Sequence, residues 1–366
     1  MVKPTRKIIR PGGRIRVLVV DDSVVIRRLV AHALEEDPTF EVVGAAANGA
    51  IALAKIPQVN PDAITLDIEM PEMDGLETLR RIRQDFPDLC VIMLSAVTAR
   101  GASATLDALA LGANDYVTKA ANVDSLDRSI ATLRSELIPK IKQFFWFPDQ
   151  IPGPPAAAPP VAAVPRIQPA APRFGALRRP RVIAVGVSTG GPTALSALIR
   201  QFPPGFPLPV LIVQHMPPLF TRFLAERLQT LTGLRVEEGA QGSAVEPGKI
   251  LIAPGNYHMR LAKNGQRVML AVDQGPPENS CRPSVDVLFR SVQETYGGSA
   301  IAVILTGMGQ DGLLGTEALK ASGAYVIAQD EASSVVWGMP GAVAKAGLAD
   351  AVVGLESVMG EILTQI

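Results

Sequence analysis

The chain has 366 residues, 48% of them hydrophobic, and its 35 basic and 35 acidic side chains give a net charge of zero. This length favours two domains, and a neutral chain argues against a DNA-binding output domain, which is usually basic. No apolar stretch is long enough to cross a bilayer, and two cysteines cannot form a disulfide framework. We therefore expect a cytoplasmic protein with free thiols, without membrane insertion or nucleic-acid binding.

A segment rich in proline and alanine divides the chain into two regions. Ten of the 31 prolines fall between Pro148 and Pro180, where the composition is typical of a semi-rigid spacer. We expect a basic, disordered N-terminal tail over 1–14, a first domain over 15–143, a linker over 144–180 and a second domain over 181–366. The basic tail lacks the apolar core of a signal peptide.

Short apolar runs alternate with amphipathic segments in the first region. The expected strands are 16–20, 41–46, 63–66, 91–94 and 116–118, and the expected helices are 24–36, 50–56, 75–84, 103–111 and 123–143. Strand and helix in regular alternation predict an α/β fold with a doubly wound parallel sheet. Five of each favour the flavodoxin-like strand order.

The second region has the same character. The expected strands are 182–187, 210–213, 250–253, 300–305 and 324–328, the expected helices are 193–200, 219–231, 285–294 and 313–321, and a hairpin joins 257–262 to 267–272. The Asn264-Gly265 pair supports the tight turn of that hairpin. We expect a Rossmann-like, mostly parallel sheet with helices on both faces and one antiparallel hairpin.

Acidic side chains end two strands of the first region. Asp21 and Asp22 follow the first strand and Asp67 ends the third, so the three carboxylates converge at one sheet edge. Such a cluster favours a hard divalent cation, Mg²⁺, and a carboxylate can itself accept a phosphoryl group. Ser95 and Lys119 end the next two strands and can contact a phosphate. The alternative is that each of these residues caps its strand independently.

The first region resembles the receiver domain of bacterial two-component response regulators over residues 15–140. The segments that carry the likeness are Val-Val-Asp21-Asp22-Ser, Leu-Asp67-Ile-Glu-Met-Pro-Glu-Met-Asp-Gly, Leu-Ser95-Ala and Tyr116-Val-Thr-Lys119. The resemblance implies that Asp67 is the phosphoacceptor and that Asp21, Asp22 and Asp67 bind the metal. It also implies that Ser95 and Lys119 sense the phosphate, and it puts Tyr116 at the family's aromatic switch position.

A serine, a histidine and an aspartate follow apolar runs of the second region. Gly186-Val-Ser188-Thr-Gly190 matches G-x-S-x-G, His215 follows the next strand, and Asp311 follows a later one. Because the carboxyl ends of parallel strands meet in one crevice, these residues can form a Ser-His-Asp catalytic group. The chain order Ser, His, Asp differs from that of the α/β-hydrolases, so an ordinary lipase fold is disfavoured.

Plainer interpretations exist for each of these residues. A glycine-rich turn can bind a dinucleotide, but Gln214-His215 stands where that site needs an acidic residue. His215 can be a core histidine, and Asp311 can be the N-cap of the helix that follows it. We expect His258 to be structural or exposed. Ser284 is expected to be an N-cap, in a loop that can also form a wall of the site.

The second region, over residues 181–364, resembles the catalytic domain of chemotaxis-type protein-glutamate methylesterases. The matching segments are Gly186-Val-Ser188-Thr-Gly-Gly, Gln-His215-Met, Arg282-Pro-Ser-Val-Asp-Val-Leu-Phe and Thr-Gly-Met308-Gly-Gln-Asp311-Gly. Pairing with a receiver through a linker fits the same family. The resemblance implies Ser188 as nucleophile, His215 as base and Asp311 as the orienting acid, with Thr189 and Met308 lining the site.

The implied function is a phosphorylation-activated serine hydrolase that removes methyl groups from glutamate γ-methyl esters of chemoreceptors and also deamidates receptor glutamines. The implied partners are a chemotaxis histidine kinase as phosphodonor and the cytoplasmic domains of methylated chemoreceptors as substrate. Mg²⁺ is implied for phosphorylation, and no cofactor for ester hydrolysis. Two rival functions are a non-catalytic regulator, which would keep its function without Ser188, and a transcriptional regulator, which would need a helix-turn-helix pattern that we do not find.

Overall fold

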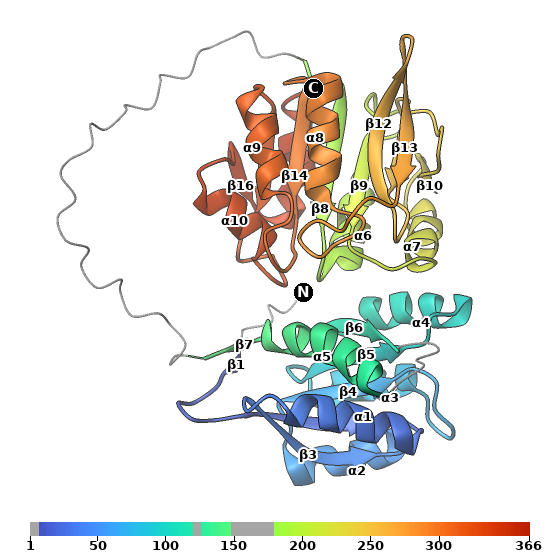
Figure 1. Ribbon diagram of the computed structural model, residues 1–366, viewed down its shortest axis with the longest axis vertical. Coiled ribbons are helices and arrows are strands. Elements are labelled where there is room, and N and C mark those ends of the chain that lie inside the picture. Colours follow the sequence, from blue (N-terminus) through green and yellow to red (C-terminus); the bar gives the residue numbers. More distant parts are fainter. Residues whose placement is uncertain (1–6, 120–125, 148–178) are drawn as a thin grey trace, which may run out of the picture.

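Two α/β domains lie one against the other, and both are built on parallel sheets (Figure 1). The computed structural model describes residues 7–119, 126–147 and 179–366. None of the helices within these ranges is long and apolar enough to cross a membrane.

The first domain contains a five-stranded parallel sheet with strand order β3-β2-β4-β5-β6. Its elements are β1 (Lys7–Ile8), β2 (Ile15–Val20), α1 (Val24–Glu35), β3 (Phe40–Ala46), α2 (Gly49–Val59), β4 (Ala63–Asp67), α3 (Gly75–Asp85), β5 (Cys90–Ser95), α4 (Ala99–Ala110), β6 (Asp115–Thr118), α5 (Leu126–Lys142) and β7 (Phe145–Trp146). This is the flavodoxin-like order expected from the sequence. Strands β4 and β5 are buried along their whole length because helices cover both faces of the sheet.

The N-terminal segment differs from the disordered tail that we expected, at least over the residues described. Strand β1 pairs in parallel with β7, in the register Lys7↔Phe145 and Ile8↔Trp146. Ile9 is buried among apolar side chains of the first domain, and Lys7 Nζ lies 2.6 Å from Asp62 Oδ1. The expected disorder was based on the basic residues of this segment. The apolar pair Ile8-Ile9, which lies among them, was the sign that part of it packs on the domain. Residues 1–6 lie outside the described ranges.

The second domain contains a seven-stranded sheet with strand order β10-β11-β9-β8-β14-β15-β16, and every pair in it is parallel. Its elements are β8 (Val182–Val187), α6 (Gly191–Ile199), β9 (Val210–Gln214), α7 (Phe220–Gln229), β10 (Arg235–Glu238), β11 (Lys249–Ile252), β12 (His258–Asn264), β13 (Arg267–Asp273), α8 (Val285–Tyr296), β14 (Ala300–Ile304), α9 (Leu313–Ala321), β15 (Tyr325–Gln329), α10 (Met339–Lys345), β16 (Ala351–Val353), η2 (Leu355–Ser357) and α11 (Val358–Leu363).

The order of these strands defines a crevice at the carboxyl edge of the sheet. The chain leaves β8 toward β9 on one side and later returns to place β14 on the other side. Connections that diverge from neighbouring strands open a crevice where ligands usually bind. Ser188 directly follows β8, His215 directly follows β9, and Thr306 lies two residues after the end of β14, so all three lie at this edge of the sheet.

The hairpin β12–β13 has a different turn from the one that we expected. Asn264 pairs with Arg267, so the two turn residues are Gly265 and Gln266. Gly265 has φ +61°, which suits a tight hairpin turn with glycine in its first central position. The expected centre of the turn, Asn264-Gly265, therefore lies one residue before the observed centre. The sequence reading also missed the edge strands β10 and β16 and the short helix α10, whose apolar periodicity is too brief to stand out.

The two domains meet through α4 and β6 of the first and α6 and α7 of the second (Figure 1). The Tyr116 ring stacks on Phe220, and Arg227 Nη1 donates to Asp107 Oδ1 at 2.6 Å. Val335 and Val336, from the loop before α10, pack into the apolar cluster of the first domain. The first domain therefore covers the edge of the second sheet that carries Ser188.

Candidate active site

Ser188 follows β8, the strand that lies between β9 and β14. Its backbone N–H donates to Thr306 O at 3.0 Å, and Gln214 Nε2 donates to Ser188 O at 3.0 Å. These bonds hold the turn on both neighbouring strand ends. Helix α6 begins three residues later, after Gly190 with φ +77°. Within the described residues the Ser188 hydroxyl makes no hydrogen bond, so it is available at the mouth of the crevice.

Glycine is needed at position 186 because α8 approaches β8 closely there. A Cβ added to Gly186 would lie 2.4 Å from Cγ1 of Val285, far inside the distance that real Cβ atoms keep. Val285 is the first residue of α8 and is fully buried. The first glycine of G-x-S-x-G thus lets α8 pack directly behind the serine turn.

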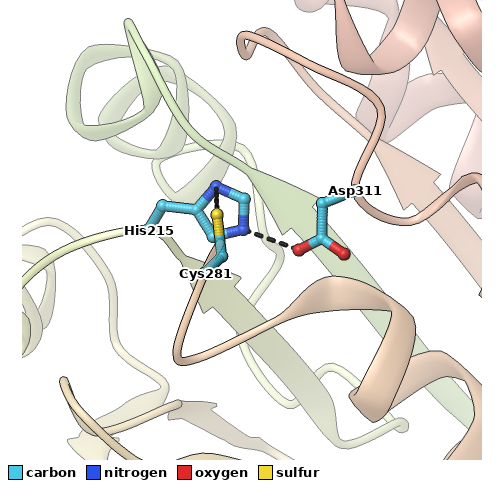
Figure 2. Close-up of side chains that lie close together, drawn as sticks. All are labelled: His215, Cys281 and Asp311. Carbon is cyan, nitrogen blue, oxygen red and sulfur yellow. Dashed lines mark hydrogen bonds and ion pairs between the residues drawn. The ribbon is translucent and has the colours of Figure 1, made fainter. Parts of the chain in front are cut away.

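His215 and Asp311 form a direct pair across the crevice (Figure 2). His215 Nε2 lies 2.8 Å from Asp311 Oδ2, and the two side chains are 13% and 3% exposed. Asp311 is ionised and accepts only, so Nε2 carries the proton of this bond. In the neutral ring Nδ1 then holds the lone pair, and Nδ1 is the nitrogen that can act as a base.

Asp311 is held by the loop before α8 and by the first turn of that helix. Its oxygens accept from Ser284 Oγ at 2.8 Å, Asn279 Nδ2 at 2.9 Å and the backbone N–H groups of Val285 and Asp286 at 2.7 and 3.2 Å. Burial alone would raise the pKa of Asp311, but His215 and these donors lower it below the ordinary value. The carboxylate therefore stays charged at the positive end of α8.

Cys281 contacts the other nitrogen of the same ring (Figure 2). Its Sγ lies 3.7 Å from His215 Nδ1. Burial disfavours the charged ring, but Asp311 and Cys281 outweigh that effect and raise the pKa of His215 above its ordinary value. From the sequence, Cys281 was expected only to be a free thiol. Its position beside the Arg282-Pro-Ser segment was the signal that could have placed it at the site.

A tight turn presents Cys281 to the histidine. Glu278 and Cys281 exchange backbone hydrogen bonds of 3.1 and 2.8 Å, and the two residues between them have positive φ, +51° at Asn279 and +61° at Ser280. This geometry is that of a two-residue hairpin turn, in which asparagine is favoured. Arg290 Nη2 donates to both carboxylate oxygens of Glu278, at 2.6 and 2.7 Å, and fixes the turn on α8.

Thr189 follows Ser188 in the chain, and Met308 lies two residues after Thr306, whose carbonyl accepts from the Ser188 N–H. The backbone N–H groups of Thr189 and Met308 donate to no acceptor in the described part of the chain. Met308 is 40% exposed, whereas Thr189 is buried, and its hydroxyl donates to Asp115 Oδ2 of the first domain at 3.0 Å. Sequence reasoning had no means of finding this contact between domains.

His258 and Ser284 are close to the crevice but have other partners. His258 is buried, with Nε2 3.0 Å from Pro276 O and Nδ1 accepting from the Ser284 N–H at 3.3 Å. It is structural. Ser284 stands at the N-cap position of α8 but makes no side-chain cap bond. The expected cap role is wrong because its hydroxyl donates to Asp311 instead.

The acidic residues of the first domain form a second pocket. Oxygen atoms of Asp21, Asp22 and Asp67 lie within 4.8 Å of one another, a set of hard donors that fits Mg²⁺. Lys119 Nζ lies 2.7 Å from both Asp21 Oδ2 and Asp67 Oδ1. Burial raises the pKa of Asp67 to about 6, against the opposing effect of Lys119.

Ser95 lies at the end of β5 but is turned toward α4. Its hydroxyl donates to Gly101 O at 3.1 Å and accepts from Thr105 Oγ1 at 2.7 Å, and its side chain is fully buried. The structure thus brings together Asp21, Asp22, Asp67 and Lys119 and leaves Ser95 bonded elsewhere. Reaching a phosphate at Asp67 requires Ser95 to exchange these bonds.

Two family models match the chain, and they match in the order of the two domains. Residues 17–131 match the response regulator receiver domain, and residues 183–362 match the CheB methylesterase domain. A protein-glutamate methylesterase/protein-glutamine glutaminase of Trichodesmium erythraeum is 51% identical over 96% of this chain and 99% of its own length. The chain belongs to the CheB family of methylesterases.

Further comparisons agree with this assignment. A protein of the same name from a Nocardioides species is 50% identical over 97% of this chain and 96% of its own. The crystal structure of the Thermotoga maritima CheB methylesterase catalytic domain, 40% identical, covers 51% of this chain and 99% of that one, with a TM-score of 0.50. These findings confirm the expected fold class, family and enzyme class. A CheB-family chain with a receiver domain is a phosphorylation-regulated carboxylic ester hydrolase. The names of its relatives also include protein-glutamine glutaminase.

Proposed function

We propose that Ser188 is the nucleophile of the esterase, with His215 as its base and Asp311 as the residue that orients the base. The observation that carries this proposal is the 2.8 Å pair between His215 and Asp311, at the carboxyl ends of strands that flank the Ser188 turn. A histidine held by an ionised, buried aspartate is the arrangement that activates a serine hydroxyl. His215 must approach Ser188 when substrate binds, as is common for catalytic hydrogen bonds that are long in the free enzyme.

The reaction proceeds in two steps. Ser188 Oγ attacks the ester carbonyl, its proton passes to His215, and the proton then goes to the departing methoxide to release methanol. Water, activated by the same histidine, hydrolyses the acyl-enzyme and leaves a glutamate carboxylate. The free N–H groups of Thr189 and Met308, together with the N-terminus of α6, are suited to stabilise the oxyanion.

The substrates in this proposal are glutamate γ-methyl esters on the cytoplasmic domains of chemoreceptors, and receptor glutamines for the side activity. The names of the relatives support the reaction, and a chain without a spanning helix among its described residues fits a cytoplasmic site of action. Ester hydrolysis needs no cofactor in this scheme. The phosphodonor is a chemotaxis histidine kinase, and neither nucleic acid nor the bilayer is a direct partner.

Asp67 is the residue that we assign as phosphoacceptor. Its carboxylate lies beside Asp21, Asp22 and Lys119, and a Mg²⁺ ion held by the three aspartates would neutralise charge on the incoming phosphoryl group. Ser95 and Lys119 would then contact the phosphate. This move would draw Ser95 away from Gly101 and Thr105 and disturb α4, one of the elements in contact with the second domain.

The unphosphorylated receiver, in this proposal, inhibits the esterase by covering its crevice. Support comes from the Thr189–Asp115 bond of 3.0 Å next to the nucleophile and from the Arg227–Asp107 pair of 2.6 Å. A change in receiver state can shift the docking equilibrium only through a difference in docking free energy. We assign residues 15–143 to the receiver, 181–366 to the esterase, 144–180 to the linker and 1–14 to an N-terminal extension.

The decisive experiment measures methanol release from methylated receptors. The native chain should release methanol, and Ser188→Ala should lower the rate by roughly three orders of magnitude or more while the circular dichroism spectrum stays native. The matched control is Ser196→Ala, which removes a hydroxyl from α6 outside the crevice. If Ser188→Ala keeps near-native turnover, the nucleophile is misassigned. If neither the native chain nor Ser196→Ala hydrolyses receptor esters, the rival function, a non-catalytic regulator, gains support.

A second experiment addresses inhibition by the receiver. A chain starting at Arg181 should hydrolyse receptor esters faster than the unphosphorylated full-length chain. Adding a small phosphodonor and Mg²⁺ to the full-length chain should close part of that gap. Equal rates for the short and the unphosphorylated long chain would eliminate occlusion as the mode of control.

A further inference from the structure

We propose that His215 and Cys281 form a binding site for a thiophilic divalent cation such as Zn²⁺, and that occupation of this site inhibits the esterase. The inhibition part rests on the function proposed above. The site consists of the Nδ1 atom of His215 and the Sγ atom of Cys281, which face each other across 3.7 Å at the edge of the crevice (Figure 2). Neither residue touches the acidic pocket of the receiver.

The spacing of the two atoms suits tetrahedral zinc. With a Zn–N distance of about 2.1 Å and a Zn–S distance of about 2.3 Å, a tetrahedral ion separates its two ligands by about 3.6 Å. The observed separation is 3.7 Å. An ion can therefore take up both ligands with little movement of either side chain. Water would complete its coordination.

Asp311 prepares the histidine for this role. A histidine that binds a metal usually donates its other ring N–H to a carboxylate, which fixes the tautomer and raises the basicity of the ligating nitrogen. His215 Nε2 donates to Asp311 Oδ2 at 2.8 Å, so in the neutral ring the lone pair lies on Nδ1, the atom that faces the sulfur. The same bond that supports catalysis thus supports metal binding.

The cysteine is held as firmly as the histidine. Its turn is bonded to α8 through Glu278 and Arg290, and Asn279 Nδ2 donates to both Asp286 Oδ2 and Asp311 Oδ1 at 2.9 Å. A sulfur on a rigid turn loses little conformational entropy when it binds an ion. Cys281 and His215 are each partly exposed, so an ion can reach them from solvent.

The donor set selects the class of metal. Imidazole nitrogen and thiolate sulfur favour Zn²⁺ over Mg²⁺, which prefers oxygen ligands. The thiol binds as a thiolate and the imidazole binds as the neutral ring, so the thiol proton, and the Nδ1 proton of a charged ring, are released to solvent when the ion is taken up. Mg²⁺ would then bind the receiver carboxylates and Zn²⁺ the esterase crevice of the same chain. A zinc ion on Nδ1 occupies the lone pair that accepts the Ser188 proton, so hydrolysis stops.

The first test follows methanol release from methylated receptors by the full-length chain in saturating Mg²⁺, with increasing Zn²⁺. We expect micromolar Zn²⁺ to reduce the rate at least tenfold. Each variant is compared with its own zinc-free rate, because Cys281 touches the catalytic base. Cys281→Ala should need more than about tenfold higher Zn²⁺ for half inhibition, whereas Cys90→Ala, which removes the buried thiol of β5, should respond like the native chain. Equal zinc sensitivity of Cys281→Ala and the native chain would overturn the proposal.

The second test needs no catalysis. Co²⁺ is added anaerobically to the full-length Ser188→Ala chain, and thiolate-to-cobalt charge-transfer absorption is recorded. The band should appear, persist in Ser188→Ala/Cys90→Ala and vanish in Ser188→Ala/Cys281→Ala. Absence of the band overturns the metal site even if Ser188 is the nucleophile. A band without zinc inhibition overturns the inhibitory role. Retained esterase activity in Ser188→Ala would instead count against the proposed function alone, because the band does not depend on it.

Discussion

Tyr116 of the receiver stacks on Phe220 of the esterase domain, with ring centroids 5.1 Å apart and ring planes 6° apart. Tyr116 lies in β6, and the centroid of its ring is 4.8 Å from Lys140 Nζ of α5. Phe220 is the first residue of α7 and is fully buried. The aromatic residue at the switch position of the receiver is thus part of the contact between domains, so it cannot be repositioned without weakening that contact.

Replacing Tyr116 should therefore activate the unphosphorylated enzyme. Such aromatic pairs contribute about 0.5–1.5 kcal/mol beyond their buried area, so Tyr116→Ala should raise methanol release by about two- to tenfold without a phosphodonor. Phe220→Ala should give a similar rise, and the double variant should add little, because both changes remove the same contact. Tyr116→Phe keeps the stacked ring and is the matched control. Unchanged activity of Tyr116→Ala would show that this stack does not contribute to inhibition.

Asp67→Asn should abolish labelling of the chain by a small radioactive phosphodonor in the presence of Mg²⁺. The amide cannot form an acyl phosphate, so this variant should also keep the low basal esterase rate when the phosphodonor is present. Asp85→Asn, at the exposed end of α3, is the control and should be labelled normally. Undiminished labelling of Asp67→Asn would place the phosphorylation site elsewhere.

Asp311→Asn should lose both activity and stability. The amide no longer holds the charged form of His215, and we expect kcat to fall by roughly 10³- to 10⁴-fold. It also removes a charged acceptor from the N-terminus of α8, so the free energy of unfolding should fall by about 2 kcal/mol or more. Ser284→Ala deletes one of the donors to Asp311 and should cost only about 1 kcal/mol. Urea unfolding and methanol release measure the two effects, and a fully active Asp311→Asn would refute the orienting role.

The pH dependence of kcat/KM should reflect the raised pKa of His215. Burial lowers the pKa of His215, but the contacts with Asp311 and Cys281 outweigh burial and raise this pKa above the ordinary value of 6.5. The base must be unprotonated to act, so activity should increase with pH and reach half its maximum above pH 6.5. Cys281→Ala removes one of the raising contacts and should move this midpoint to lower pH, whereas Cys90→Ala should leave it in place. A midpoint that does not respond to Cys281→Ala would contradict the role assigned to that contact.

Most elements of both domains could be predicted because their strands are continuous apolar runs buried on both faces. Residues 182–187, the run before Ser188, form β8 over the same residues that the sequence indicated. The acidic pocket was also predictable, since Asp21 and Asp67 end neighbouring strands and parallel strands place their carboxyl ends together. Apolar runs in the sequence therefore predict where the strands lie, and the residues that follow them predict which side chains meet at the sheet edge.

Contacts that depend on turn geometry or on domain docking could not be predicted from the periodicity of apolar residues. Cys281 reaches His215 through a turn with positive φ at Asn279 and Ser280, and serine gives no sequence signal for that conformation. Asp115 reaches Thr189 from a separate domain, and no local pattern reports how two domains dock. The pairing of β1 with β7 joins Lys7 to Phe145, which are far apart in the sequence, and strands of two residues give no signal for such a pairing.

The close approach of Val285 to Gly186 has a consequence for how this sequence can evolve. A side chain at position 186 has no room unless position 285 becomes smaller, since the two would otherwise overlap at 2.4 Å. Alanine at 186 should therefore be accepted only together with alanine or glycine at 285. Because Val285 also donates its backbone N–H to Asp311, any such exchange alters the support of the catalytic acid. Substitution at position 186, on the serine turn, is thereby linked to substitution at position 285, at the start of the helix packed behind that turn, and we expect these two positions to covary in descendants of this gene.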